Sequence, residues 1–99
     1  MQNIKATEQH KTVKIIVEGP LVSGNVNFVS TIKTFPSSHH FIVDLTSAET
    51  IDSSGLGLLM ILREYTTNSN KIRIVGSQPS IIQIFQMAKF NDFFDIDGY

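Results

Sequence analysis

The sequence predicts a single α/β domain over residues 1–99, with a mixed, mostly parallel sheet flanked by helices. Two observations predict this class. Segments with the two-residue alternation of strands take turns along the chain with segments whose apolar residues recur at helical spacing. The connections between them are short, which favours right-handed crossovers between parallel strands. A chain of 99 residues has room for one core only.

The first two strands are close enough in sequence to form an antiparallel hairpin. Residues 4–8 suit a short edge strand, and the turn after it falls at residues 10–11. Residues 12–17 alternate between apolar and polar side chains, as a half-buried strand does. The glycine and proline at 19–20 are expected to end that strand. Its inward-facing side chains are predicted to be Val13, Ile15 and Val17.

A first helix is expected after this strand. Ser23, Gly24 and Asn25 offer N-caps for it. Apolar residues then recur at spacings of three and four, which is typical of one helical face. These residues are Val26, Phe28, Val29, Ile32 and Phe35. After a loop at 36–40, the short apolar segment 41–45 reads as an inner strand covered on at least one face.

The second half repeats the alternation of helix and strand. A helix is predicted over 54–65, a strand over 72–75, a helix from Pro79 to about residue 89, and a closing strand over 93–96. Proline suits the first position of a helix because its missing N–H is not needed there. The residues of this last helix that are expected to face inward are Ile81, Ile84, Phe85 and Ala88.

The most informative motif is Asp52-Ser53-Ser54-Gly55-Leu56-Gly57, which opens the helix at 54–65. Asp52 or Ser53 can cap the first turn, and the glycines allow a close turn of the backbone. The free N–H groups and positive dipole end of a helix stabilise an anion, including a phosphate on serine. The hexapeptide alone also fits an ordinary capping turn without chemistry.

In its context, this motif resembles the STAS family of bacterial anti-sigma factor antagonists. The apolar strand 41–46 is followed a few residues later by the motif segment 51–59, in the order typical of that family. The likeness continues through 71–79 and 81–96, so it covers residues 12–96. It implies the STAS fold, and a protein that binds an anti-sigma factor and so frees a sigma factor.

The resemblance also implies a phosphorylation switch. The acceptor is expected to be Ser53, with Ser54 the second choice. The kinase would be the partner anti-sigma factor itself, which binds the unphosphorylated form, and a serine phosphatase would reverse the reaction. A phosphate on Ser53 would lie near Asp52, and near Asp44 if that residue ends the preceding strand. The expected partner-binding residues are Asp44, Asp52, Ser53, Ser54, Gly55, Leu56 and Met60.

Two features keep other readings open. Met60 is chosen from an apolar helix because a flexible thioether suits partner surfaces, although such a helix is usually just buried. Val22 stands where the family commonly has an aspartate near the phosphorylation site. The alternative is therefore a STAS structural or scaffold subunit of an ABC lipid-transport or stress-signalling complex, without a phosphorylation switch.

Composition excludes several other classes of function. The net charge is -1, with no run of either sign, so nucleic-acid binding is not expected. No cysteine is present, which fits the cytoplasm. Residues 1–8 lack the apolar core of a signal peptide, and no apolar run is long enough to insert in a membrane.

Enzymatic activity is not expected either, because there is no nucleophile elbow and no glycine-rich phosphate loop with lysine. Asp44 and Asp52 are better interpreted as solvated residues than as a catalytic or magnesium-binding pair. The histidines at 10, 39 and 40 come from predicted loops, and the pair at 39–40 has no acidic or thiol ligand nearby in the sequence, so no metal and no cofactor are predicted. The sequence predicts no particular oligomeric state.

Overall fold

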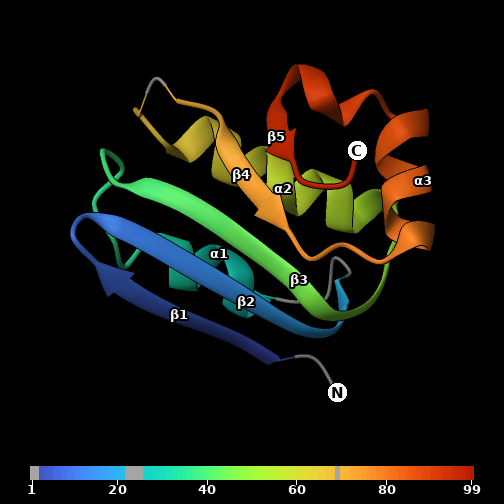
Figure 1. The fold of residues 1–99 in the computed structure, drawn as a ribbon. Helices are drawn as coiled ribbons and strands as arrows, with labels where there is room; N and C mark the ends of the chain where they lie inside the picture. The colour runs from blue at the N-terminus through green and yellow to red at the C-terminus, as the bar shows by residue number, and fades with distance from the viewer. Residues whose placement is uncertain (1–2, 22–25, 69) are drawn as a thin grey trace.

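A computed structural model describes residues 3–21, 26–68 and 70–99 of the chain (Figure 1). The elements, in chain order, are β1 (Asn3–Gln9), β2 (Thr12–Leu21), α1 (Val26–Ile32), β3 (His40–Ile51), α2 (Ser53–Tyr65), β4 (Ile72–Val75), α3 (Pro79–Met87), the 3-10 helix η1 (Phe90–Asp92) and β5 (Phe94–Ile96). Within the described ranges, no helix is both long enough and apolar enough to cross a bilayer.

The five strands form one sheet in the order β1-β2-β3-β4-β5. The pair β1–β2 is antiparallel, and the other three pairs are parallel. The helices α1 and α2 lie on one face of the sheet, whereas no helix of the described residues covers the opposite face (Figure 1). The predicted α/β class with a mixed, mostly parallel sheet is therefore confirmed.

The core lies between the sheet and its helices. Val13, Ile15 and Val17 are fully buried, so the predicted inward face of β2 is correct. At the other edge of the sheet, the ring of Phe90 stacks on those of Phe85 and Phe94, with ring centroids 5.5 and 5.2 Å apart. These contacts hold α3 and β5 together.

Two strands run further than predicted. The Gly19–Pro20 pair does not end β2, which continues to Leu21 because Gly19 takes a φ of 83° next to irregularities in the register with β3. β3 continues six residues beyond the predicted end at Leu45, and its Ile51 pairs with Leu21. The extension contains several polar residues, so the sequence pattern predicts a loop there instead of a strand.

Two helix predictions and one strand prediction also need correction. α1 ends at Ile32, and Phe35 packs against the core from beyond its end. On α3, Ala88 is exposed and Ile84 is only half-buried. The first residue of the closing strand is Phe94, because Phe93 follows the 3-10 turn of η1. The predicted caps Ser23, Gly24 and Asn25 lie outside the described residues.

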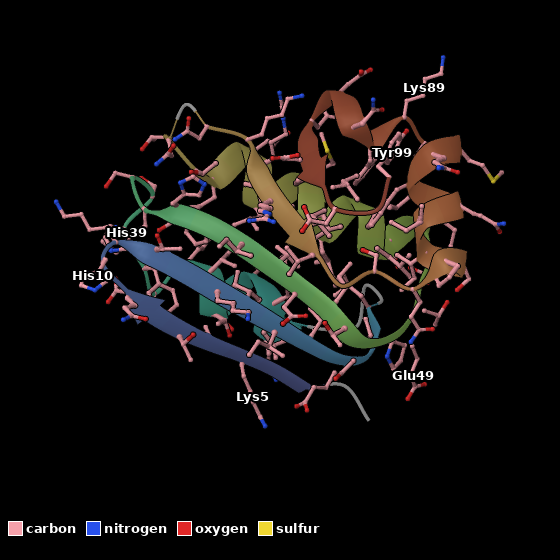
Figure 2. The ribbon with its side chains drawn as sticks, viewed as in Figure 1. Lys5, His10, His39, Glu49, Lys89 and Tyr99 are labelled. Atoms are coloured by element: carbon pink, nitrogen blue, oxygen red, sulfur yellow. The ribbon has the colours of Figure 1, made fainter. Side chains whose placement is uncertain are left out.

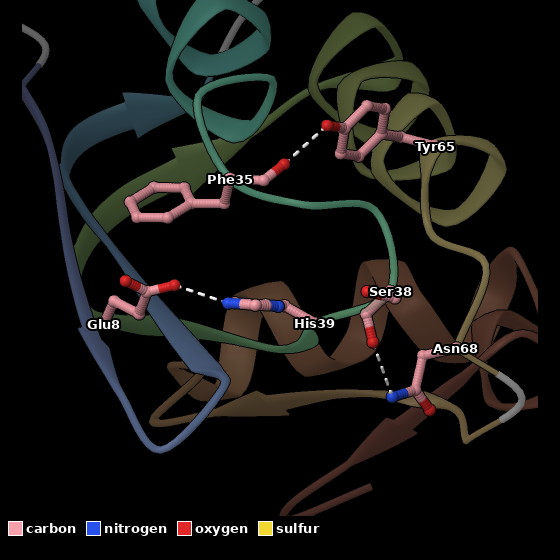
Figure 3. A network of polar contacts seen from close by, with 6 residues as sticks. All are labelled: Glu8, Phe35, Ser38, His39, Tyr65 and Asn68. Carbon is pink, nitrogen blue, oxygen red and sulfur yellow. Dashed lines mark hydrogen bonds and ion pairs between the residues drawn. The ribbon is translucent and has the colours of Figure 1, made fainter.

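The segment between α1 and β3 is fastened at one end of the molecule (Figure 3). Among the contacts that hold it, Tyr65 Oη donates to the Phe35 carbonyl at 2.5 Å, Asn68 Nδ2 donates to the Ser38 carbonyl at 3.3 Å, and His39 Nε2 lies 2.5 Å from a carboxylate oxygen of Glu8. The last contact joins this segment to β1. The amino-terminal end of β3 is thus tied both to α2 and to the hairpin.

Candidate functional site

The predicted motif lies at the start of α2, which follows the end of β3 almost directly in the chain. Asp52 is the N-cap, with extended backbone angles. Its Oδ1 accepts a hydrogen bond of 2.8 Å from the Gly55 N–H and one of 2.5 Å from the Ser54 hydroxyl. These two bonds, that of Ser54 first, lower the pKa of the Asp52 carboxyl below 3.8. Asp52 is therefore a carboxylate at neutral pH.

The two serines differ in their surroundings. Ser54 is half-buried, and its hydroxyl is engaged by Asp52. Ser53, the first residue of α2, is exposed, and among the described residues its hydroxyl has no hydrogen-bond partner. A reagent approaching from solvent can reach the Ser53 oxygen without breaking a hydrogen bond to any described residue.

An apolar depression of about 400 Å³ lies next to Ser53, between the start of α2 and the end of α3. We call it the serine-side depression. It is lined by Ile51, Asp52, Ser53, Leu56, Ile84, Met87 and Ala88. Met87 is 86% exposed, so its apolar side chain is available at the surface of the depression. The depression offers an apolar contact surface with a single carboxylate and the serine at its rim.

Sequence reasoning missed the part of this surface that α3 provides. It placed Ile84 and Ala88 in the core and did not consider Met87. The available signal was that α3 has more apolar residues than one buried face needs. Only the structure shows which of them are left over beside Ser53.

Gly55 is buried rather than exposed. A Cβ built on it would lie 2.1 Å from the Leu21 carbonyl oxygen and 2.8 Å from a side-chain carbon of Ile51. The helix start can approach the ends of β2 and β3 this closely only because residue 55 has no side chain. Gly55 therefore seats the motif on the sheet, and its assignment as a partner-binding residue stays a prediction.

Asp44 does not lie at the end of its strand. It is in the middle of β3 and alternates with the buried residues Val43 and Leu45, so its side chain faces the uncovered side of the sheet. There its carboxylate lies 3.4 Å from Lys14 Nζ and accepts a hydrogen bond from the Thr46 N–H. Burial raises the pKa of Asp44, but the Thr46 bonds and Lys14 outweigh it and lower that pKa overall. Asp44 is thus not part of the site at Ser53.

Met60 is half-buried and packs against the core, and its role as a partner contact stays a prediction. The outward side of α2 is instead formed by residues that recur every three or four positions: Ser53, Gly57, Ile61 and Glu64. Ile61, with 39% of its surface exposed, is the large apolar residue on this side. Leu56, also half-buried, lines the serine-side depression as described above.

Neither the acidic residues nor the histidines gather into a metal site. Asp44 lies in the middle of β3 and Asp52 at the start of α2, and among residues 3–21, 26–68 and 70–99 no group of three or more metal-ligating side chains occurs. Val22, at the position of the missing aspartate, lies outside the described residues. The lining at Ser53 offers an exposed hydroxyl, the Asp52 carboxylate and an apolar contact surface.

Comparison with known proteins matches this geometry to one family. The STAS domain family model matches residues 3–98. A STAS-domain containing protein of Pseudomonas aeruginosa (strain UCBPP-PA14) is 33% identical over 57 residues, which are 57% of this chain and 56% of that protein. The aligned segment thus spans about half the length of that curated relative.

Solved structures share the fold. An anti-sigma factor antagonist from Mycobacterium paratuberculosis superposes with a TM-score of 0.84 at 15% identity, covering 100% of this chain and 87% of that one. The anti-sigma factor antagonist SpoIIAA in its unphosphorylated form gives 0.68 at 20% identity, over 100% and 89%. A STAS domain of an antisigma-factor antagonist from Rhodobacter sphaeroides gives 0.55 at 17% identity, over 76% and 86%. At these identities the likeness is one of fold.

Proposed function

The chain belongs to the STAS-domain family, and we propose that it acts as an anti-sigma factor antagonist whose binding is switched by phosphorylation of Ser53. In this proposal the unphosphorylated chain binds an anti-sigma factor that is also a serine kinase, and so frees a sigma factor. The similarity of its fold to anti-sigma factor antagonists supports the general role.

The observation that carries the proposal is the difference between Ser53 and Ser54. The Ser54 hydroxyl is occupied by Asp52, whereas the Ser53 hydroxyl is exposed at the first position of α2. A kinase needs an accessible hydroxyl that can enter its own active site. The local geometry therefore favours Ser53 as the acceptor.

The serine-side depression supports the proposal that the partner binds beside Ser53. Leu56, Ile84 and Met87 offer apolar area immediately beside Ser53. An apolar side chain of the partner can fill this depression while Ser53 lies at its rim. Aromatic or aliphatic anchors in such pockets usually supply most of the binding energy of an interface.

The effect of a phosphate follows from local charge. Phosphorylation adds about -1.5 to -2 charge and three strong acceptors. The start of α2 tolerates that charge in the free protein, since helix N-termini favour anions. A docked partner would have to desolvate it beside the Asp52 carboxylate, which is already charged because its pKa is lowered. The switch then requires no large change of conformation.

The test is capture of the tagged chain from its native cells, with mass spectrometry of both the bait and the captured protein. We expect an anti-sigma factor with a kinase domain, and phosphate on the peptide that contains Ser53. Ser53→Ala should remove the phosphate, whereas the matched control Ser54→Ala should keep it. Phosphate on Ser54 alone would overturn the assignment of the acceptor.

Val22 favours a second candidate, a structural or scaffold subunit of an ABC lipid-transport or stress-signalling complex. In such a subunit the aspartate that the family commonly has at this position would not be needed. This candidate predicts capture of transport or scaffold components by a bait without phosphate. It also predicts that Ser53→Ala leaves the set of captured proteins unchanged.

A further inference from the structure

Met87 brings an accessible sulfur atom to the surface beside Ser53. The chain has three methionines and no cysteine, so every sulfur atom in it belongs to a thioether. Met60 is half-buried and packs against the core, whereas Met87 is 86% exposed. Met1 lies outside the described residues. Where thiols are absent, thioethers are the side chains that peroxides oxidise most readily. Among the described residues, a peroxide therefore reaches the sulfur of Met87 first.

The position of Met87 gives its oxidation a consequence. Met87 is the last residue of α3, and the chain leaves the helix at Lys89, which has a left-handed φ of 54°. Lys89 points away from the fold at this end of the molecule (Figure 2). Met87 also lines the serine-side depression, in which Ser53 lies at the rim. A side chain that solvent reaches in the free chain thus becomes part of the contact surface when a partner docks there.

Oxidation of Met87 by a peroxide is a balanced two-electron step. The sulfur attacks one oxygen of hydrogen peroxide, the O–O bond breaks, and the other oxygen leaves as water after proton transfer. The sulfur loses two electrons and becomes a sulfoxide, while the peroxide is reduced. Methionine sulfoxide reductases reverse the change, because their thiols supply two electrons and become a disulfide while the sulfoxide oxygen leaves as water. The modification is therefore reversible.

A sulfoxide on Met87 changes the depression without changing the fold. In the free chain, water hydrates the new oxygen, because the side chain is exposed. When an apolar group of a partner covers the depression, the oxygen loses this water. Among the other described side chains that line the depression, only the Ser53 hydroxyl can donate a hydrogen bond in its place. Burial of a poorly paired polar group is unfavourable, so the oxidised surface binds an apolar partner less well.

We propose that Met87 is a reversible oxidation site that regulates docking at the serine-side depression. The inference rests on the proposed function, because both concern the same contact surface. Oxidation of Met87 on α3 weakens binding of the anti-sigma factor in the same direction as a phosphate on Ser53 of α2, but it needs no kinase. The depression then responds to two signals, a peroxide and a phosphate, each received on a different helix.

The first part of the test uses the full chain alone. The chain is treated with hydrogen peroxide, and mass spectrometry of its peptides follows sulfoxide formation at each methionine over time. We expect Met87 to be oxidised at least about tenfold faster than Met60, which packing against the core protects. NMR spectra of the oxidised chain report whether it stays folded. Equal rates at the two residues, or unfolding when Met87 alone is oxidised, would overturn the proposal.

The second part measures binding of the anti-sigma factor that the unphosphorylated chain captures. Peroxide treatment of the chain should weaken binding about tenfold, and treatment with sulfoxide reductases should restore it. In Met87→Leu, the ratio of the affinities before and after peroxide should stay near one, whatever the starting affinity of the variant. The matched control Met60→Leu keeps the exposed thioether and should still show the tenfold ratio.

The inference and the proposed function fail in different ways. Equal binding by the oxidised and the reduced chain, or a peroxide effect that persists in Met87→Leu, would overturn the role of Met87 and leave the proposed function standing. The same holds for a loss that the reductases do not reverse. A reduced chain that captures no anti-sigma factor would contradict the proposed function, and this inference with it.

Discussion

The carbonyl oxygen of Leu21 lies 2.1 Å from the position that a Cβ on Gly55 would occupy. A methyl group there would meet backbone rather than the end of a flexible side chain. We therefore expect Gly55→Ala to lower the free energy of unfolding by about 3 kcal/mol, as overpacking does. Denaturant titration measures this loss.

Gly57 offers the matched control, because a Cβ on it would meet no atom within 4 Å. Gly57→Ala should stabilise the chain by about 0.5–1 kcal/mol, since alanine is the better helix former. A Gly55→Ala variant as stable as the wild type would show that the start of α2 can move away from the sheet.

Much of the fold could be predicted because binary pattern and turn chemistry agree along most of the chain. The alternation of Val13, Ile15 and Val17 specified the buried side of β2, and Pro79 marked the first turn of α3. The ends of β2 and β3 could not be predicted in this way. They depend on pairing between Leu21 and Ile51, which are distant in sequence and surrounded by turn-forming residues.

The candidate site likewise has features that local sequence predicts and features that depend on tertiary packing. The cap at Asp52 and the exposure of Ser53 follow from local sequence. The burial of Gly55 and the exposure of Met87 do not, since both depend on which element packs against which. Asp44 was misplaced because its strand was taken to end one residue later, whereas it continues for seven.

The β1–β2 turn should be a site of easy stabilisation. Replacing His10 and Lys11 with Asn and Gly relieves two strained left-handed residues. We expect a gain of about 1–2 kcal/mol in the free energy of unfolding. Thermal denaturation of the variant tests this, and an unchanged melting temperature would indicate that the turn is not strained.

Acid should destabilise the protein partly through Asp52. Its pKa is lowered in the folded state from the ordinary value of 3.8, so its stabilising effect is complete above that value and is lost as the pH falls through the folded-state pKa. Asp52→Asn keeps a good N-cap residue but removes the charge. The variant should therefore lose less stability than the wild type between about pH 5 and pH 2. Identical losses for the two proteins would contradict this role.

Two substitutions on α3 should separate binding from folding. Met87 is 86% exposed, so Met87→Lys should change the free energy of unfolding by less than about 0.5 kcal/mol. It should nevertheless weaken binding of the anti-sigma factor about tenfold or more if Met87 is a contact anchor. Phe85→Ala, at a fully buried position of the same helix, should lose about 3–5 kcal/mol of stability. Calorimetric binding and denaturation experiments on both variants provide the measurements.

The release of sigma factor should be stoichiometric, because the proposed role is to occupy a partner rather than to turn over a substrate. Titration of the unphosphorylated chain into the complex of sigma and anti-sigma factor should free sigma factor in proportion to the amount added. The form phosphorylated on Ser53 should need about tenfold more, which corresponds to a coupling of about 1.4 kcal/mol. Release of many sigma molecules per chain would instead indicate catalysis. Equal potency of the two forms would favour the scaffold role, in which the charge on Ser53 has no bearing on binding.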